Sequence, residues 1–341
     1  MKIAINGLGR IGRNILKIIF EKRKDQFFEI VAVNEFSNKE QICHFMKYDT
    51  VHGRFKGQIE TYSSGIVIND KKIKCISEKS TIKLPWKKMN VDLVVDCSGK
   101  HTKKIEAYKH IQAGAKKVLI SANGDNNIDK TVVFGINEHE IQEENKIISN
   151  SSCTTNCLAF LVKALIGKFK IEEGYVNTIH AYTNDQNLID NYKNDLRRAR
   201  CANESIIPTT TGSIQSIGKI FKQLDGKIKG VATRVPVKNV SFLDFIFTVS
   251  VETDIIEINS ILVSFVKQIK YKNLITFNDL PLVSVDFNNT DYSCIFDLTQ
   301  TNVIGKLVKV SAWYDNEWGY ANRMVDMTEF LLFKIKRNVR L

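Results

Sequence analysis

The sequence lacks any apolar run near the ~18 residues that a membrane-spanning helix needs. It has only four prolines, and no proline-rich linker, low-complexity tract or internal repeat divides it. We therefore expect no membrane insertion and no repeat architecture. With 341 residues the chain is long enough for two domains and a sizeable core. Hydrophobic residues at 43% and charged residues at 25% are ordinary globular values.

Regularly spaced cysteine pairs are also missing. The seven cysteines show no disulfide-like pattern, and no secretory signal peptide is recognisable. Both observations favour reduced thiols and a cytoplasmic location. Cys153 and Cys157 stand one helical turn apart, but no second Cys or His pair with zinc spacing accompanies them, so we expect no metal site.

Acidic residues are too few to balance the basic ones. The chain has 49 lysines and arginines against 37 aspartates and glutamates, a net charge of +12. This excess suits either a nucleic-acid surface or a protein that handles anionic metabolites. The basic residues are scattered along the chain, and no aromatic-basic recognition module appears. We therefore do not expect nucleic-acid binding as the main role.

The first half of the chain alternates strand-like and helix-like segments. The patterns predict strands at 2–6, 29–33, 91–96, 117–120, 131–134 and 146–148, and helices at 11–21 and 103–113. Such alternation is typical of parallel strands joined by helical crossovers. It predicts an α/β sheet covered on both faces.

The pattern changes beyond residue 152. Long strand-like runs appear at 175–179, 229–235, 241–251, 282–286 and 307–313, and few of them alternate with helices. This predicts a second, α+β domain built on a large, mostly antiparallel sheet. We therefore expect domains at 1–152 and 153–317. A final helix at about 318–341 is expected to pack back on the first domain.

A thiol stands where a helix is predicted to begin. Residues 149–157 read Ser-Asn-Ser-Ser-Cys-Thr-Thr-Asn-Cys and lead into an apolar, helix-periodic run at 158–169. Ser, Thr and Asn are the usual N-cap residues. Cys153 would then lie among free backbone N–H groups at the positive end of a helix dipole, which lower a thiol pKa and stabilise anions. The alternative, a buried structural cysteine, fits these polar neighbours less well.

A glycine-rich loop follows the first predicted strand and opens the first helix. Gly7 would permit a tight turn, Gly9 the close approach of a pyrophosphate, and Gly12 close helix–strand packing. Arg10 and Ile11 complete the loop, and the helix N-terminus would supply N–H donors to phosphates. This context predicts a dinucleotide site. An ordinary glycine-rich βα turn is the alternative.

Glu35 follows the second predicted strand, 23 residues after Gly12. A carboxylate there can accept hydrogen bonds from a ribose 2′-OH and would repel a 2′-phosphate. The position therefore favours NAD over NADP as the cofactor. A solvated loop carboxylate is the alternative.

His180 lies 27 residues after Cys153, at the end of the strand-like run 175–179. Cysteine chemistry needs a base or a cationic partner, and imidazole titrates in the right range. Spacing alone does not make this pair catalytic, because a lone histidine is more often structural.

Seven motifs, in this order along the chain, carry a family resemblance: AINGLGRIGRN, SNSSCTTNC, HAYTNDQ, DLRRAR, IIPTTTG, RVP and WYDNEWGY. Together they resemble the phosphorylating glyceraldehyde-3-phosphate dehydrogenase family, from residue 2 to about residue 327. The resemblance implies a Rossmann domain, a catalytic α+β domain, NAD as cofactor and a homotetramer. It also implies glyceraldehyde 3-phosphate and inorganic phosphate as substrates.

The resemblance further implies a mechanism. Cys153 would attack the aldehyde carbon and form a hemithioacetal. His180 would activate the thiol and then remove the hydroxyl proton as hydride leaves for NAD. Inorganic phosphate would cleave the resulting thioester and release 1,3-bisphosphoglycerate. Covalent capture splits the oxidation from the phosphorylation, and the thioester stores the oxidation energy.

The family's other site positions are carried over onto this chain in the same way. Those of the anion site match Ser152, Thr154, Thr183, Arg200, Thr211, Gly212 and Arg234. Guanidinium groups suit phosphate because they donate bidentate bonds. Arg197 and Arg198 are interpreted as a charged surface run.

Four further positions resemble those around the nicotinamide cofactor. Asn316 would orient the nicotinamide carboxamide, and Tyr320 would pack near the ring. Lys79 would lie on the adenine side and Ser121 on the nicotinamide side. A structural role for Tyr320 in the core is the alternative.

Two departures leave a rival open. Glu35 stands where the glycolytic enzymes more often have aspartate, and residues 281–288 look like the related erythrose-4-phosphate dehydrogenases. The threonines of HAYTNDQ and PTTTGS favour the glyceraldehyde enzymes. From a different class, a non-catalytic Rossmann binding module or an RNA-associated protein is disfavoured by the intact Cys153, His180 and Arg234. The physiological direction of the reaction stays open.

Overall fold

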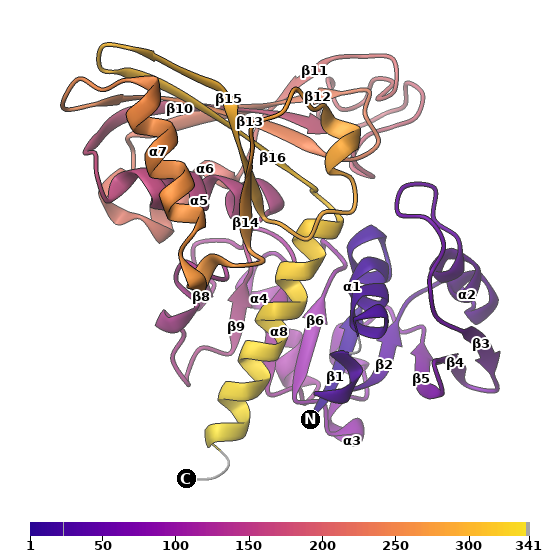
Figure 1. Cartoon of the computed structure of the whole chain (residues 1–341). Coiled ribbons are helices and arrows are strands. Elements are labelled where there is room, and N and C mark those ends of the chain that lie inside the picture. Colours follow the sequence, from indigo (N-terminus) through magenta and orange to yellow (C-terminus); the bar gives the residue numbers. More distant parts are fainter. Residues whose placement is uncertain (23, 339–341) are drawn as a thin grey trace. The chain divides into compact units, whose positions relative to one another are not determined.

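The computed structural model describes residues 1–22 and 24–338 of the chain (Figure 1). The chain divides into two compact units, Met1–Ser151 with Ala321–Leu341, and Ser152–Tyr320. The C-terminal helix α8 spans Trp318–Asn338. The last three residues of the helix expected at about 318–341 therefore lie outside the described residues.

A nine-stranded sheet forms the centre of the first unit. Its strands are β1 (Lys2–Asn6), β2 (Glu29–Asn34), β3 (Ile59–Tyr62), β4 (Gly65–Ile68), β5 (Lys71–Ile76), β6 (Leu93–Asp96), β7 (Lys117–Ile120), β8 (Lys130–Thr131) and β9 (Ile147–Ser149). Their order is β3-β4-β5-β2-β1-β6-β7-β9-β8. The helices are α1 (Arg10–Glu21), α2 (Lys39–Lys47), α3 (Trp86–Met89) and α4 (Lys104–Gln112), together with most of α8.

The six neighbouring strands β5-β2-β1-β6-β7-β9 of this sheet are parallel, and their order is that of a doubly wound dinucleotide-binding sheet. In such sheets a ligand binds beyond the carboxyl ends of the strands where the order reverses, here around β1. The residues of β6 and β7 are buried throughout, which fits the apolar runs 93–95 and 118–120 that make up most of each strand. The predicted strand at 131–134 is shorter in the structure, where β8 ends at Thr131.

A seven-stranded sheet forms the second unit. Its strands are β10 (Ile171–Ala181), β11 (Ile207–Thr209), β12 (Ile228–Val235), β13 (Ser241–Val249), β14 (Ile275–Asn278), β15 (Cys294–Ile304) and β16 (Leu307–Tyr314), in the order β11-β12-β10-β13-β16-β15-β14. Four of the six neighbouring pairs are antiparallel; β10–β12 and β14–β15 are parallel. The helices are α5 (Cys153–Ile166), α6 (Ser213–Ile220) and α7 (Ile255–Val266). The expected fold class is confirmed.

Burial along β13 alternates with a period of two, as expected for a sheet with one covered face. Leu243, Phe245 and Phe247 are buried, whereas Ile246 is exposed. The prediction of a strand at 282–286 is wrong, because the 3-10 helix η6 (Ser284–Phe287) overlaps this segment. No strand pairs with it among the described residues, and the Asp286 carboxylate instead accepts a hydrogen bond from the backbone of Val283.

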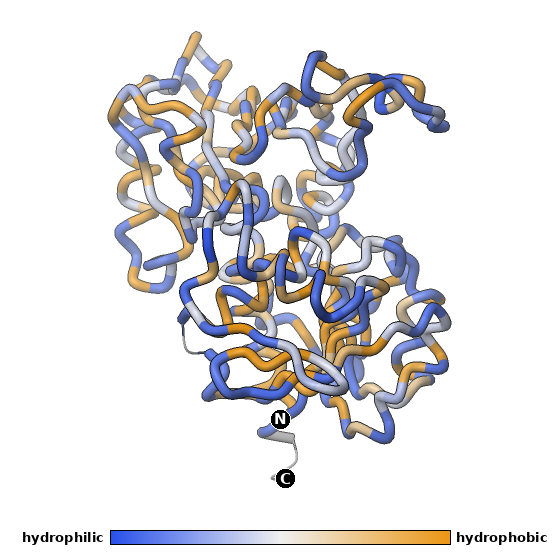
Figure 2. Tube along the Cα trace, turned by 90° about the vertical axis from the view of Figure 1, so that its right-hand side faces the viewer, coloured by the Kyte–Doolittle hydropathy of each residue, from blue (hydrophilic) through white to orange (hydrophobic). Residues whose placement is uncertain are grey.

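Hydrophobic and hydrophilic stretches alternate along the described residues (Figure 2). Among the helices of the described residues, none combines the length and apolar character required to cross a membrane.

Candidate functional site

Helix α5 begins at the predicted nucleophile. Ser152 is the N-cap, and its hydroxyl oxygen accepts a hydrogen bond from the backbone N–H of Thr155 at 3.1 Å. Cys153 is the first helical residue. Ser151, just before the cap, has φ 58°, a left-handed conformation that is uncommon for a residue other than glycine. The local cap chemistry therefore confirms the predicted helix start.

The end of β10 brings His180 to this thiol. The Cys153 Sγ and the His180 Nε2 are 3.6 Å apart. The other ring nitrogen, Nδ1, lies 2.6 Å from the carbonyl oxygen of Ala181. When Nδ1–H donates to that carbonyl, the Nε2 lone pair faces the thiol. This tautomer is the one that a base for Cys153 requires.

Arg234 lies on β12, directly opposite His180 in the parallel register of β10 and β12. Its Nη1 contacts the His180 Nδ1 and donates to the Ala181 carbonyl oxygen at 2.9 Å. Its Nε is buried and has no hydrogen-bond partner among the described residues. Buried donors are normally satisfied, so an unpartnered guanidinium N–H near a thiol is suited to an anionic ligand.

Burial dominates the electrostatics of this pair. It raises the pKa of the Cys153 thiol to about 11, against the opposing effects of the Arg234 charge and the backbone N–H groups at the start of α5. Burial, and then Arg234, lower the pKa of His180 to about 3. The expected lowering of the thiol pKa is thus reversed, because removing a thiolate from water outweighs the helix N-terminus. A neutral thiol faces a neutral imidazole.

A buried tyrosine lies close behind the nucleophile. The Tyr314 hydroxyl is 2.8 Å from the Thr154 Oγ1 and 2.7 Å from the Thr178 Oγ1. Burial, and then the neighbouring Cys153, raise the pKa of Tyr314, so this hydroxyl stays protonated. Thr154, which the resemblance places in the anion site, directs its hydroxyl into this buried network.

The start of α6 lies beside the start of α5. The Ser152 Oγ and the Ser213 Oγ are 2.9 Å apart, and the Thr211 hydroxyl donates to Ser213 at 3.0 Å. Gly212 is the N-cap of the eight-residue α6. The structure therefore brings Ser152, Thr211 and Gly212 together near Cys153. Hydroxyls and backbone N–H groups at two helix starts form a polar surface that suits phosphate.

The arginines of the loop 182–206 are placed differently from expectation. Arg200 is exposed, and its Nε pairs with Asp190 at 2.7 Å. Arg198 is the one held against the 207–211 segment, because its Nε donates to the Thr209 Oγ1 at 2.8 Å. The charge of Arg198 also acts on Arg234. Sequence reasoning missed Arg198, since neighbouring arginines in a loop carry no signal of which one turns inward.

The loop after β10 also holds Thr183, which is half-buried. Its backbone N–H lies 3.4 Å from the Gln186 Oε1. This places Thr183 three residues beyond His180, on the segment that leaves the sheet.

A single hydroxyl joins His180's neighbour to Asn316. The Ser241 Oγ accepts from the Ala181 backbone N–H at 3.2 Å and donates to the Asn316 Oδ1 at 2.9 Å. Val240, just before Ser241, has φ 68°, an outlier for a β-branched residue that a functional constraint can explain. With its carbonyl engaged, Asn316 can offer its amide NH₂ to a ligand. Tyr320 is buried in the first turn of α8.

In the first unit the three glycines of the loop after β1 differ in the space around them. Gly7 has φ +91°, and a Cβ there would lie 2.9 Å from the backbone of Ser98. A Cβ on Gly12 would lie 2.1 Å from the Gly7 carbonyl oxygen. A Cβ on Gly9 would meet nothing within 4 Å. Gly9 thus borders open space at the N-terminus of α1, where an anion can approach.

A pocket of about 300 Å³ opens beside this loop. It is lined by Asn6, Gly7, Gly9, Asn34, Glu35, Phe36, Glu78, Lys79, Thr81, Cys97, Ser98, Lys100 and His101. Glu35 is positioned at it by two backbone N–H donors, Leu8 and Phe36, each at 2.7 Å. The expected Glu35 and Lys79 therefore share one pocket with Gly7 and Gly9.

The other predicted cofactor residues lie outside that lining: Arg10, Ile11, Gly12, Ser121, Asn316 and Tyr320. Arg10 pairs with Asp49 at 2.7 Å. Ile11 is half-buried in the first turn of α1. Ser121 follows β7, and its backbone N–H donates to the Asp96 carbonyl oxygen at 2.9 Å.

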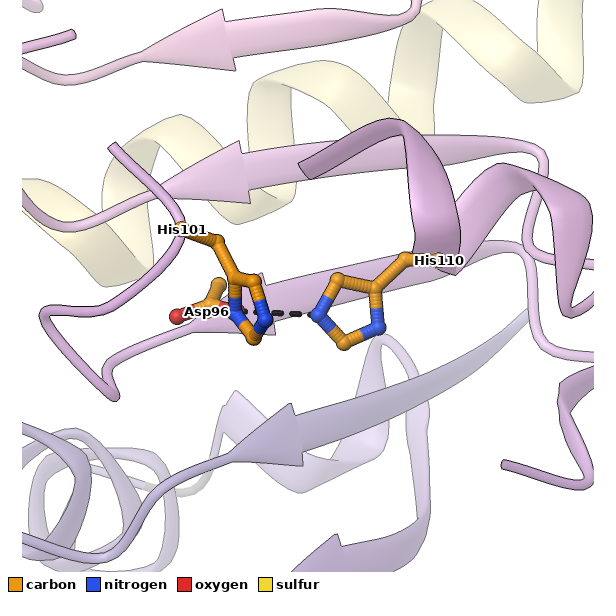
Figure 3. A group of neighbouring side chains, drawn as sticks. All are labelled: Asp96, His101 and His110. Atoms are coloured by element: carbon orange, nitrogen blue, oxygen red, sulfur yellow. Dashed lines mark hydrogen bonds and ion pairs between the residues drawn. The ribbon is translucent and has the colours of Figure 1, made fainter. Parts of the chain in front are cut away.

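Within the described part of the chain, Asp96, His101 and His110 have the spacing of metal ligands, with one ligand atom of each within 4.8 Å of the others (Figure 3). Trp86 donates its indole N–H to the His110 Nδ1 at 3.0 Å, so the ring proton of His110 is on Nε2. A metal bound at Nε2 would move that proton to Nδ1, where it would face the indole N–H. The group therefore fits a hydrogen-bond network better than a metal.

A doubly wound sheet with a glycine-rich loop and an acidic residue after β2, joined to a unit with a thiol–imidazole–guanidinium cluster, defines a nicotinamide-dependent oxidoreductase. Residues 1–104 match the family model "Glyceraldehyde 3-phosphate dehydrogenase, NAD binding domain", and residues 152–316 match that family's C-terminal domain. The chain belongs to the glyceraldehyde 3-phosphate dehydrogenase family, whose members are NAD-dependent oxidoreductases. This confirms the resemblance and NAD as the cofactor.

Curated relatives agree over almost the full length. The plasmid-encoded glyceraldehyde-3-phosphate dehydrogenase of Cupriavidus necator is 46% identical over 326 residues, which cover 96% of this chain and 97% of the relative. The chromosomal enzyme of the same organism is also 46% identical over the same coverage. The glyceraldehyde-3-phosphate dehydrogenase of Pseudomonas aeruginosa is 44% identical, with 96% of each chain covered.

Proposed function

We propose that this protein is a phosphorylating glyceraldehyde-3-phosphate dehydrogenase. It would oxidise glyceraldehyde 3-phosphate with NAD and inorganic phosphate to 1,3-bisphosphoglycerate. The observation that carries the proposal is the 3.6 Å approach of the Cys153 thiol to the His180 imidazole, with Arg234 beside them. The names of the curated relatives support the same substrate.

The protonation states of Cys153 and His180, a thiol and a neutral imidazole, support a route through a thioester. The neutral His180 takes the thiol proton at Nε2, and Sγ attacks the aldehyde carbon. The proton then passes to the alkoxide and gives a hemithioacetal on Cys153. Nε2 removes that hydroxyl proton again as hydride leaves the carbon, and a thioester on Sγ results. When bound, NAD supplies the hydride acceptor. Phosphate attack on the thioester carbon then releases the acyl phosphate, and the sulfur takes the proton back from Nε2.

The cationic and polar groups near the thiol would hold the two anions. Arg234 offers its buried, unpartnered Nε, and the starts of α5 and α6 offer hydroxyls and N–H groups. We propose that Arg198 rather than Arg200 serves the anion site. Both arginines pair with carboxylates of their loop, Arg198 with Asp185 and Asp195 and Arg200 with Asp190. Arg198 is favoured because its side chain is 22% exposed, against 67% for Arg200, and because its Nε donates to Thr209. The Cys153 backbone N–H, with His180, is suited to a tetrahedral oxyanion.

For the cofactor, we propose that Gly9 and the N-terminus of α1 receive the pyrophosphate and that Glu35 accepts from the ribose. The Asn316 amide would donate to the nicotinamide carboxamide. We also propose a homotetramer in the cytoplasm. An uncovered face of the seven-stranded sheet, with Tyr175 and Ile246 exposed, supports subunit contacts.

Steady-state rates test the proposal. The wild-type chain should reduce NAD with glyceraldehyde 3-phosphate only when inorganic phosphate is present, and Cys153→Ser should lose this activity by at least about 10³-fold. Erythrose 4-phosphate is the competing substrate, because Glu35 and residues 281–288 look like that subfamily. Faster, phosphate-independent oxidation of erythrose 4-phosphate would overturn the proposal in favour of the rival.

A further inference from the structure

The Asp96 carboxylate, at the end of β6, is the centre of a hydrogen-bond network that reaches the pocket of the first unit. Its Oδ2 accepts from the His101 Nδ1 at 2.6 Å, the His110 Nε2 at 2.9 Å and the Asn6 Nδ2 at 3.0 Å. Its Oδ1 accepts from the Ser98 N–H and hydroxyl. Burial alone would raise the pKa of Asp96, but the bonds from both histidines lower it. The carboxylate is therefore a fixed negative charge. Figure 3 shows it together with the two imidazole rings.

The two histidines on this carboxylate differ in what their other nitrogen can do. His110 is fully buried, and its Nδ1 already accepts the Trp86 indole N–H. A second proton on His110 would sit on Nδ1, where this N–H would face the indole N–H of Trp86. The His101 Nε2 instead lies 2.9 Å from the Thr81 hydroxyl, which can donate to a neutral ring or accept from a charged one. Only His101 can gain a proton with every hydrogen bond retained.

His101 is also the histidine of this pair that lines the pocket beside Gly7 and Gly9. Its side chain is 12% exposed. The charged groups around it are mixed in sign: Asp96 contacts it, Glu106 of α4 interacts with it electrostatically, and Glu35, Glu78, Lys79 and Lys100 share the pocket. A positive imidazole on this wall would favour an anionic ligand.

We propose that His101 takes up a proton when the dinucleotide binds, so that cofactor affinity is coupled to pH. The inference rests on the proposed cofactor site. The diphosphate favours the charged imidazole, Asp96 stabilises that charge, and Thr81 accepts the additional N–H. By linkage, the ligand that favours the protonated ring binds more tightly as the pH falls. We expect NAD to bind about fivefold more tightly at pH 6 than at pH 8.

Calorimetry of NAD binding to the full-length protein tests the coupling. At pH 7, titrations in two buffers of different ionisation enthalpy should reveal uptake of a fraction of a proton. The variants His101→Gln and His101→Phe should still bind NAD but lose both the proton uptake and the pH dependence. His139→Gln is the matched control, because His139 is exposed and lies outside the pocket lining; it should retain both. His180, with a pKa of about 3, does not titrate between pH 6 and 8.

The possible results are distinguishable. Proton uptake that persists unchanged in both His101 variants overturns the inference, and so does binding by the wild type with no uptake. The wild-type measurement decides the matter if neither variant folds. A wild-type protein that does not bind NAD at all overturns the proposed function itself.

Discussion

Alanine at Gly9 should separate cofactor binding from folding. The backbone at Gly9 is extended, with φ −63° and ψ −164°, so alanine fits it without strain, and the added methyl meets no atom within 4 Å. The free energy of unfolding should therefore change by less than about 1 kcal/mol. The same methyl would occupy the space that we assign to the pyrophosphate. We expect the Kd for NAD to rise about 10- to 100-fold, or about 1.4–2.7 kcal/mol.

Alanine at Gly12 is the matched comparison. Its Cβ would lie 2.1 Å from the Gly7 carbonyl oxygen, well inside the ordinary contact distance, so the loop or α1 must shift. Overpacking of this kind costs about 1–3 kcal/mol, and the displaced loop should also bind NAD poorly. Urea denaturation and NAD calorimetry on both variants measure the two effects. If Gly9→Ala bound NAD like the wild type, the phosphates could not lie where we place them.

Three further predictions concern the second unit and cofactor choice. Arg198→Leu should raise the KM for phosphate or for glyceraldehyde 3-phosphate about tenfold or more, whereas Arg200→Leu should change it less than twofold; equal effects in initial-rate assays would contradict our assignment. Because the pKa of His180 is about 3 when folded but near 6.5 when unfolded, the unfolded chain alone gains this proton on acidification. Stability should therefore fall below about pH 6.5, by about 2 kcal/mol at pH 5 from this residue. His180→Asn should be less acid-sensitive in urea denaturation, and an unchanged pH profile would argue against a neutral buried imidazole. Glu35→Ser should gain use of NADP, because it removes the charge that opposes a 2′-phosphate. Unchanged NADP kinetics would show that Glu35 does not determine the cofactor preference.

Sequence patterns located those elements whose signals are local. The bounds expected for β1 and β7 are those found, because a buried parallel strand is a continuous apolar run between polar neighbours. The start of α5 was equally predictable, since an N-cap depends on a few adjacent residues. Segment 282–286 has the same apolar character, but it lacks a partner strand and forms η6. Pairing is a tertiary property, which also explains why the edge hairpin β3–β4 went unnoticed.

The α/β fold class, the glycine-rich loop after β1, the acidic Glu35 and the thiol at a helix start could all be predicted from the residue pattern alone. Three features become visible only in the folded chain: His180 meets Cys153, Arg198 rather than Arg200 turns inward, and the thiol is protonated at rest. Backbone preferences act over a few residues, and the sequence displays them directly. Contacts between distant segments, and the loss of water around a charge, exist only after the sheets have formed.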